Sequence, residues 1–354
     1  MTRKCGAALL AVAGLRATPL MAQASPDSAP PLAAAPARLF ATTEPLNLTL
    51  TADFGAVNKQ RGNEKHPLPG VLSYVTASGD TVALSVQLRT RGHFRLKLCQ
   101  YPPLKLTFDR TQTAHTVFAH QNSLKLVVQC RGGRSWANYI LEEYLIYRVY
   151  NLLTDRSFRV RLAHVTYADA KGKHEPETRN AFFVEDDDRM ARRNNAVVFK
   201  AKGARQADLD SAQMSVTAVF QYLIGNTDWA VSALHNIVLI RDSTTGVLYP
   251  VPYDFDWSGV IWTPYAYPDD RLGIRTVRDR MFRGACRTPA QLAESFVPFN
   301  QQKDAIYGLY RGEIAEGLEA KRVEQALDYY DDFYKTIGDA GRARRAMIVG
   351  CHES

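Results

Sequence analysis

Polar residues that follow apolar segments in a fixed order constrain the fold of residues 222–256 more than any other feature of the chain. An apolar helix ends at a glycine, and Asp228 follows in a polar turn. Asn236 begins a strand-like run, and a short hairpin and second strand lead to Asp254 and Asp256. Residues i and i+2 of an extended segment point to the same side, so these two carboxylates can share one cation. The order predicts helix, turn, strand, hairpin and strand, with oxygen-bearing side chains at the connections.

The same order of Asp, Asn and Asp is the arrangement that kinases use for phosphoryl transfer. One Asp orients the attacking hydroxyl, while the Asn and the later Asp hold the metal that bridges the nucleotide phosphates. In this chain Asp228 would be the catalytic residue, and Asn236, Asp254 and Asp256 would be the metal ligands. Mg²⁺ needs only a few hard oxygens beside the phosphates, which one Asn and two Asp supply. The alternative interpretation is that these residues form ordinary structural turns, because each is common by itself.

Composition is that of an ordinary globular protein. The chain has 354 residues, of which 46% are hydrophobic and 23% charged. This length fits two lobes or one large domain. The net charge is +8, and the basic residues are dispersed, whereas a nucleic-acid footprint needs them on one face. We therefore expect no nucleic-acid partner.

The N-terminus is typical of an exported protein. Residues 1–24 combine two early basic residues, an apolar run at 7–15 and the small-residue site Ala22-Gln-Ala24, which predicts a signal peptide cleaved after Ala24. We expect a periplasmic or secreted location and no transmembrane segment after cleavage, since no later stretch has the ~18 apolar residues that a membrane helix needs. Residues 25–38 are rich in Pro and Ala, which predicts a disordered linker.

Four cysteines remain after the predicted cleavage: Cys99, Cys130, Cys286 and Cys351. An even number in an exported chain favours disulfides, and four cysteines allow three connectivities. Proximity in sequence favours Cys99–Cys130 and Cys286–Cys351, and buried free thiols are the alternative.

The pattern of apolar residues divides the rest of the chain into a β-rich lobe at 39–200 and a more helical lobe at 201–354. Alternation and turn residues predict a strand that begins at Leu46 and further strands at 70–77, 81–89, 104–108, 123–129, 158–167, 181–184 and 196–200. Helical spacing predicts helices at 135–153 and 208–224 and through most of 303–348.

Glu143 interrupts the apolar face of the helix predicted at 135–153. Two interpretations stay open for it. The side chain lies at the edge of the apolar stripe and reaches solvent, or it points inward and pairs with a lysine of the β-rich lobe.

Three motifs in the second half resemble the signature of the CotH kinase family, the spore-coat-protein-H-like atypical protein kinases: Gly225-Asn-Thr-Asp-Trp229, His235-Asn236 and Tyr253-Asp-Phe-Asp256. The resemblance covers about residues 80–265. Arg89-Thr-Arg-Gly92 followed by Pro102-Pro-Leu-Lys-Leu106 is similar to the family's Arg-Gly segment and basic strand, and Phe182-Phe-Val-Glu185 is similar to its hinge strand.

The resemblance implies a reduced kinase-like fold that uses ATP and a divalent metal, Mg²⁺ or Mn²⁺. It implies that Lys105 binds the nucleotide phosphates, with Lys125 as the rival, and that Glu143 is the partner of that lysine. Glu185 would lie at the adenine side.

These observations predict an α+β, two-lobed, kinase-like fold with a β-rich N-terminal lobe and a more helical C-terminal lobe. The predicted function is an exported atypical kinase that transfers the γ-phosphoryl group of ATP to a protein or small hydroxyl-bearing acceptor. The alternative is a non-catalytic envelope or surface protein that uses the same scaffold to bind a partner.

Overall fold

The computed structural model describes residues 38–62, 64–349 and 351, together with Met1 and Thr2. The predicted signal peptide beyond Thr2, and the predicted linker up to residue 37, lie outside the described residues. Within the described part, no helix combines the length and the apolar character needed to cross a membrane.

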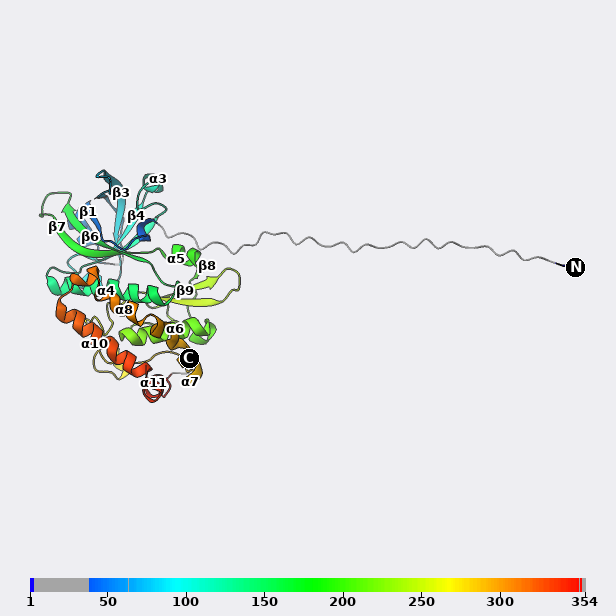
Figure 1. Ribbon diagram of the computed structural model, residues 1–354. Coiled ribbons are helices and arrows are strands. Elements are labelled where there is room, and N and C mark those ends of the chain that lie inside the picture. Colours follow the sequence, from blue (N-terminus) through cyan, green and yellow to red (C-terminus); the bar gives the residue numbers. More distant parts are fainter. Residues whose placement is uncertain (3–37, 63, 350, 352–354) are drawn as a thin grey trace. The chain divides into compact units, whose positions relative to one another are not determined.

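Seven strands of the first half of the chain close into a barrel, which lies at the top of Figure 1. In barrel order they are β1 (Leu46–Ala52), β2 (Leu68–Val75), β3 (Thr81–Thr90), β4 (Leu104–Phe108), β5 (Ser123–Val128), β7 (Glu177–Val184) and β6 (Val160–Asp169). Neighbours are antiparallel except β1 and β6, which close the barrel as a parallel pair with Leu46 opposite Ala163. Alternate residues such as Leu50 and Leu106 point inward and fill the interior with apolar side chains.

The predicted α+β, two-lobed, kinase-like fold is wrong, because the N-terminal strands form a closed barrel. The strands themselves are confirmed within a few residues, from β2 to β6. Closure depends on the pairing of β1 with β6, which are far apart in the sequence. Alternating hydrophobicity indicates that each segment is a strand, but it carries no information about which distant strand becomes its neighbour.

The long helix α4 (Arg134–Leu153) lies below the barrel in Figure 1 and packs against β6, β7, α6 and α8. Every residue from Ile140 to Tyr147 is buried, including the carboxylates of Glu142 and Glu143. A buried carboxylate requires a compensating partner. Arg322 provides it for Glu142 at 2.6 Å, and the partner of Glu143 belongs to the candidate site.

The remaining helices of the described residues are mostly short. They are η1 (Arg38–Phe40), α1 (Phe54–Lys59), α2 (Phe94–Leu98), α3 (Arg110–Thr113), α5 (Asp187–Arg193), η2 (Gln206–Asp208), α6 (Ser211–Ile224), η3 (Asp270–Leu272), α7 (Pro289–Gln301), α8 (Lys303–Leu309), α9 (Glu313–Glu316), α10 (Ala320–Ile337) and α11 (Ala340–Met347). The helices predicted at 135–153 and 208–224 are confirmed as α4 and α6.

A second, three-stranded antiparallel sheet positions the polar motifs. Its order is β10 (Leu248–Pro252), β9 (Ile237–Asp242) and β8 (Ala196–Phe199). Asn236 stands directly before β9, and Asp254 stands two residues after β10. The backbone N–H of Tyr253 donates to the carbonyl oxygen of Asn236 at 3.0 Å, so the pairing of the two strands holds both motif residues side by side.

Two disulfides join Cys99 to Cys130 and Cys286 to Cys351, which confirms the connectivity predicted from sequence proximity. The first ties the residue after α2 to the second residue after β5, and the second ties the C-terminal segment to the segment before α7. Disulfides persist in oxidising compartments, so both are compatible with a secreted protein.

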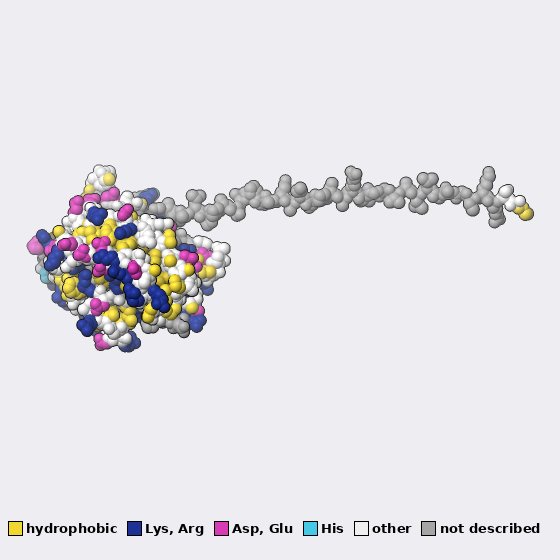
Figure 2. Space-filling model, turned by 60° about the horizontal axis from the view of Figure 1, so that its bottom comes forward, with side chains coloured by type: hydrophobic (Ala, Val, Ile, Leu, Met, Phe, Trp, Pro, Cys, Tyr) yellow, Lys and Arg dark blue, Asp and Glu magenta, His cyan; other side chains and the backbone are white. Residues whose placement is uncertain are grey.

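Basic side chains on the surface are interspersed with acidic ones. On the face drawn in Figure 2, Lys and Arg side chains lie among apolar and acidic ones. Exposed ion pairs such as Arg205 with Asp208 add to this mixture. The expectation that the protein has no nucleic-acid partner stays a prediction.

Gly225 ends α6 with φ of 65°, and a Cβ atom there would lie 1.9 Å from the hydroxyl oxygen of Tyr329. Gly225→Ala should lower the free energy of unfolding by about 2–4 kcal/mol, because the clash adds to the cost of the left-handed backbone. Urea unfolding measures the loss.

Gly273→Ala is the matched control, since Gly273 has φ of 68° but nothing within 4 Å of the added atom. It should lose only about 1 kcal/mol. Adding Tyr329→Phe to Gly225→Ala should restore part of the stability. Equal losses at the two glycines would contradict the close packing behind the 226–229 turn.

Candidate active site

The turn that carries Asp228 is fixed from both sides. The backbone N–H of Asp228 donates to Asn226 Oδ1 at 3.0 Å. Arg283 Nη1 donates to the carbonyl oxygens of Thr227 and Trp229, the latter at 2.7 Å. The residues on either side of Asp228 are thus held by a single guanidinium, which sets the direction of the carboxylate between them.

Both carboxylate oxygens of Asp228 contact side chains of the segment before β9. His235 Nε2 lies 2.7 Å from Oδ1, and Asn236 Nδ2 donates to Oδ2 at 2.9 Å and to the backbone carbonyl of Asp228 at 2.8 Å. The Asp228 side chain is still 32% exposed. The predicted catalytic and metal residues Asp228 and Asn236 are therefore in direct contact.

Asn236 and Asp254, both predicted metal ligands, have a left-handed backbone, with φ of 51° and 64°. This conformation costs a non-glycine residue roughly 1–2 kcal/mol, and such strain persists where the surroundings impose it, often at functional sites. Asn and Asp adopt this conformation more readily than other non-glycine residues, and four further non-glycine residues among those described also have it.

Arg95 of α2 lies among three carboxylates, Glu143, Asp254 and Asp256, which we call the acid cluster. Its Nη1 and Nη2 bind the two oxygens of Glu143 at 3.1 and 3.2 Å. Nη2 also contacts Asp254 Oδ1, and Nε lies 3.2 Å from Asp256 Oδ2. One buried guanidinium therefore pairs with acids from α4 and from the segment after β10.

The three carboxyl groups of the acid cluster differ in the direction of their pKa shifts. Burial raises the pKa of Glu143 and, more strongly, that of Asp256, and Arg95 opposes both effects. Burial also acts to raise the pKa of Asp254, but Arg95 and Arg91 outweigh it and leave that pKa below its ordinary value. Asp254, whose side chain is 34% exposed, is thus the carboxyl group of the cluster that ionises most readily.

Glu143 points inward, as the sharper sequence interpretation predicts, but its partner is Arg95 instead of a lysine. Lys125 contacts Asp187 at 2.6 Å and lies about 5 Å from the rings of Phe158 and Tyr253. Burial lowers the pKa of Lys125, and Asp187 opposes that shift. Lys125 is therefore paired with Asp187, the first residue of α5, and not with Glu143.

Lys105 and Glu185 stand apart from the acid cluster. Lys105 is half-buried on β4, paired in register with Arg89 on one side and Lys125 on the other. Glu185 is buried, and its carboxylate accepts from Arg193 and from the backbone N–H of Arg159. Neither residue lines the two pockets described next.

Two pockets meet at Asp228. The first, the arginine pocket, has a volume of about 420 Å³ and is lined by Arg91, Arg95, Asn236 and Asp254, among others. The second, the aromatic pocket, has a volume of about 740 Å³. Asp228, His235 and Trp257 line both, so the Asp228 carboxylate is accessible from either side.

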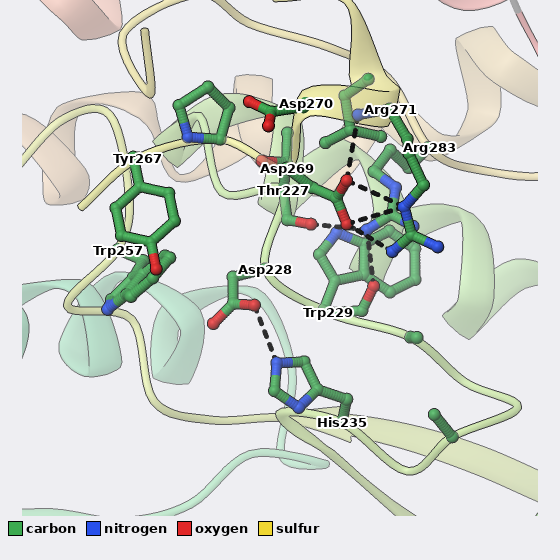
Figure 3. A pocket seen from close by; sticks show the side chains of 14 residues that line it. Thr227, Asp228, Trp229, His235, Trp257, Tyr267, Asp269, Asp270, Arg271 and Arg283 are labelled. Atoms are coloured by element: carbon green, nitrogen blue, oxygen red, sulfur yellow. Dashed lines mark hydrogen bonds and ion pairs between the residues drawn. The ribbon is translucent and has the colours of Figure 1, made fainter. Parts of the chain in front are cut away.

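The aromatic pocket is seen closely in Figure 3. Asp228 and His235 lie at one side, and Trp257 and Tyr267 lie at another. Asp269 and Arg271 lie opposite Asp228 and His235. The rings of Trp257 and Tyr267 are 4.9 Å apart. The pocket therefore combines apolar ring faces with charged groups around one carboxylate.

A run of aromatic contacts continues from this pocket along the rim of the arginine pocket. It passes through Tyr267, Trp257, Phe94, Tyr265 and Trp136, with ring centroids 4.9 to 5.9 Å apart. Tyr265 also donates its hydroxyl to Asp256 at 3.0 Å. We call this set the aromatic run.

The donor set fits a hard divalent cation in part. Asn236 commits its amide nitrogen to Asp228, which leaves its amide oxygen for a cation, and Asp254 adds an ionised carboxylate at the pocket surface. Asp256 is different, because its side chain is only 8% exposed and is held by Arg95 and Tyr265. Asn236 and Asp254 are thus the residues suited to a metal, and Arg95 is the cation of the acid cluster.

Sequence reasoning missed His235, Arg95 and Arg283. His235 adjoins Asn236, but a single histidine beside a strand carries little signal. Arg95 follows the Arg89–Gly92 segment by three positions, and that local excess of arginine is the signal that could have found it. The position of Arg283 against the Asp228 turn has no local signal.

The comparisons with known proteins add no relative: no protein-family model matches the chain, and no curated protein matches its sequence. The resemblance to the CotH kinase family stays a prediction.

Arg95→Met should lower the free energy of unfolding by about 3–5 kcal/mol at neutral pH, because it leaves buried carboxylates without their cation. Without Arg95 the folded-state pKa values of the three acids should all exceed their unfolded values of about 4, so the folded state binds more protons. Stability of the variant should then fall as pH rises from about 4 towards 8. Urea unfolding across that range measures the loss.

Arg134→Met, at an exposed arginine that begins α4, is the control and should change stability little at any pH. A loss in Arg95→Met that does not depend on pH would contradict the role of Arg95 as the cation of the acid cluster.

Proposed function

We propose that this protein transfers the γ-phosphoryl group of ATP to a hydroxyl of a protein or small-molecule acceptor, with Mg²⁺ or Mn²⁺. The observation that supports this most is the position of Asp228 on a wall shared by two pockets, hydrogen-bonded to Asn236. A transferase needs a donor and an acceptor to meet at one proton-accepting group. The proposal concerns activity and implies no kinase-like fold.

The arginine pocket is the proposed donor side. Arg91 and Arg95 line it, and guanidinium groups suit phosphate oxygens because they present paired donors in one plane. Asn236 and Asp254 would hold the metal, which would neutralise charge on the phosphates. Arg95 thus replaces the lysine that the resemblance to the CotH kinase family implies, with Glu143 in the same supporting place.

The aromatic pocket is the proposed acceptor side. A hydroxyl that enters there meets the carboxylate of Asp228, which would orient it and accept its proton as the new oxygen–phosphorus bond forms and the bond to the β-phosphate oxygen breaks. Asn236 fixes one oxygen of Asp228 by a hydrogen bond. His235, 2.7 Å from the other oxygen and 54% exposed, would hold the carboxylate in place.

We place this activity outside the cytoplasm. The two disulfides are compatible with export, and the sequence predicts a signal peptide at residues 1–24. Whether the location is periplasmic or extracellular is a finer distinction that fractionation of the source cells would decide.

Asp228→Asn should lower transfer of label from radiolabelled ATP by about 100-fold or more, because the amide cannot accept the hydroxyl proton. It should leave the thermal shift caused by ATP and Mg²⁺ nearly intact, since the fold and the donor side are unchanged. Asp80→Asn, at an exposed turn between β2 and β3, is the matched control and should retain full transfer. Undiminished transfer in Asp228→Asn would end the assignment.

Asp254→Asn should behave differently from Asp228→Asn, since it removes a proposed metal ligand. Both the metal-dependent thermal shift with ATP and the transfer should be lost. The unfolding temperature of the ligand-free variant should differ little from that of the unaltered protein. If Asp254→Asn keeps its metal-dependent shift, Asp254 does not hold the metal.

The aromatic run favours a second candidate function, a non-catalytic surface that binds a partner. Aromatic residues are enriched at the cores of interfaces, and Phe94 and Tyr267 are exposed. The same measurements separate the two functions. A protein that shows neither transfer nor any thermal shift with ATP and metal would favour the binding function.

A further inference from the structure

A second arginine-lined pocket lies away from the candidate active site. It has a volume of about 180 Å³ and shares no lining residue with the arginine or aromatic pockets. Three arginines from different segments line it: Arg148 from α4, Arg159 from the segment before β6, and Arg193 from the end of α5. Thr42 and Thr43 add hydroxyl groups.

Arg193 is fully engaged and forms the fixed part of this pocket. Its Nε and Nη2 bind Glu185 at 3.2 and 2.8 Å, and its Nη1 donates to the carbonyl oxygen of Asp155 at 2.8 Å. The buried carboxylate of Glu185 therefore forms its ion pair with Arg193.

Arg148 and Arg159 have no ion-pair partner within the part of the chain that the structure describes. Arg148 Nη1 donates only to the hydroxyl of Tyr144, at 3.2 Å. Arg159 Nη1 is buried and has no hydrogen-bond partner among the described residues. The one acidic residue that lines the pocket is Asp155, which is exposed to solvent. The pocket thus holds an excess of positive charge and unused donors.

This arrangement costs free energy without an anion. An arginine stays protonated at any physiological pH, so it cannot relieve the cost by losing its proton. Burial and the like charge of Arg193 lower the pKa of Arg159, and Glu185 and Asp155 offset this shift only in part. A bound anion would satisfy the buried Nη1 and offset the repulsion.

We propose that this pocket, lined by Arg148, Arg159 and Arg193, is a binding site for a phosphate-type oxyanion group, distinct from the candidate active site. Arg148 and Arg159 come from different segments of the chain, and Thr42 and Thr43 line the same pocket. A tetrahedral group offers three or four acceptor oxygens to such a set, whereas a carboxylate offers two in one plane. The group is either free phosphate or the phosphomonoester of a larger molecule.

Calorimetric titration of the full chain tests the site, with inorganic phosphate in one arm and O-phosphoserine in the other, each against chloride at equal ionic strength. We expect a dissociation constant in the millimolar range or below for at least one ligand, weakened about tenfold or more in Arg159→Met and in Arg148→Met. Tighter binding of phosphate indicates the free ion as ligand, and equal or tighter binding of O-phosphoserine indicates a larger phosphomonoester.

Arg156→Met is the matched control. Arg156 is a near neighbour in sequence, but its guanidinium lies 3.8 Å from the ring centroid of Tyr249 and does not line the pocket. Arg156→Met should bind phosphate as the unaltered chain does, so weaker binding in Arg159→Met and Arg148→Met assigns the phosphate to this pocket. Thermal unfolding without ligand verifies that each variant folds. If Arg159→Met does not fold, Arg148→Met alone tests the site.

The proposal is overturned if the unaltered chain binds neither ligand at about 10 mM. It is also overturned if folded Arg159→Met and Arg148→Met bind phosphate as tightly as Arg156→Met. Either result would leave the three arginines with a structural role only.

Discussion

The candidate site depends on one buried guanidinium. Arg95 joins α2, which the Cys99–Cys130 disulfide ties to the end of β5, to Glu143 of α4 and to the two acids after β10. Without a cation at this point, like charges would face one another in a buried space, and each acid would favour its protonated form. The ion pairs of Arg95 therefore link α2, the long helix and the segment after β10 at one buried point.

The Asp228 turn is held by a separate set of contacts. Arg283 fixes the backbone on either side of Asp228, and Asn236 and His235 fix the carboxylate. The acid cluster and this turn meet only at the arginine pocket, where Asn236 and Asp254 lie at the ends of two paired strands. This division allows the proposed donor side to be charge-balanced by Arg95 while the proposed proton acceptor stays accessible from the aromatic pocket.

The sequence predicted the local structure better than its assembly. Alternation located the strands, and proximity paired the four cysteines correctly. The spacing of Asp228, Asn236 and Asp254 indicated residues that the structure brings to one pocket. The closure of the barrel through β1 and β6 escaped prediction, because strand pairing over a long separation leaves no periodic signal. The sequence also did not predict that Arg95, and not a lysine, is the partner of Glu143. The two lysines considered lie on barrel strands, and Lys125 pairs with Asp187 instead.

The decisive measurement is a crystal structure with Mg²⁺ and a non-hydrolysable ATP analogue. We expect the metal on Asn236 and Asp254, the phosphates beside Arg91 and Arg95, and Asp228 free to contact a hydroxyl from the aromatic pocket. A metal that displaces Arg95 from the acid cluster, or a nucleotide bound away from the arginine pocket, would rule out the proposed donor side.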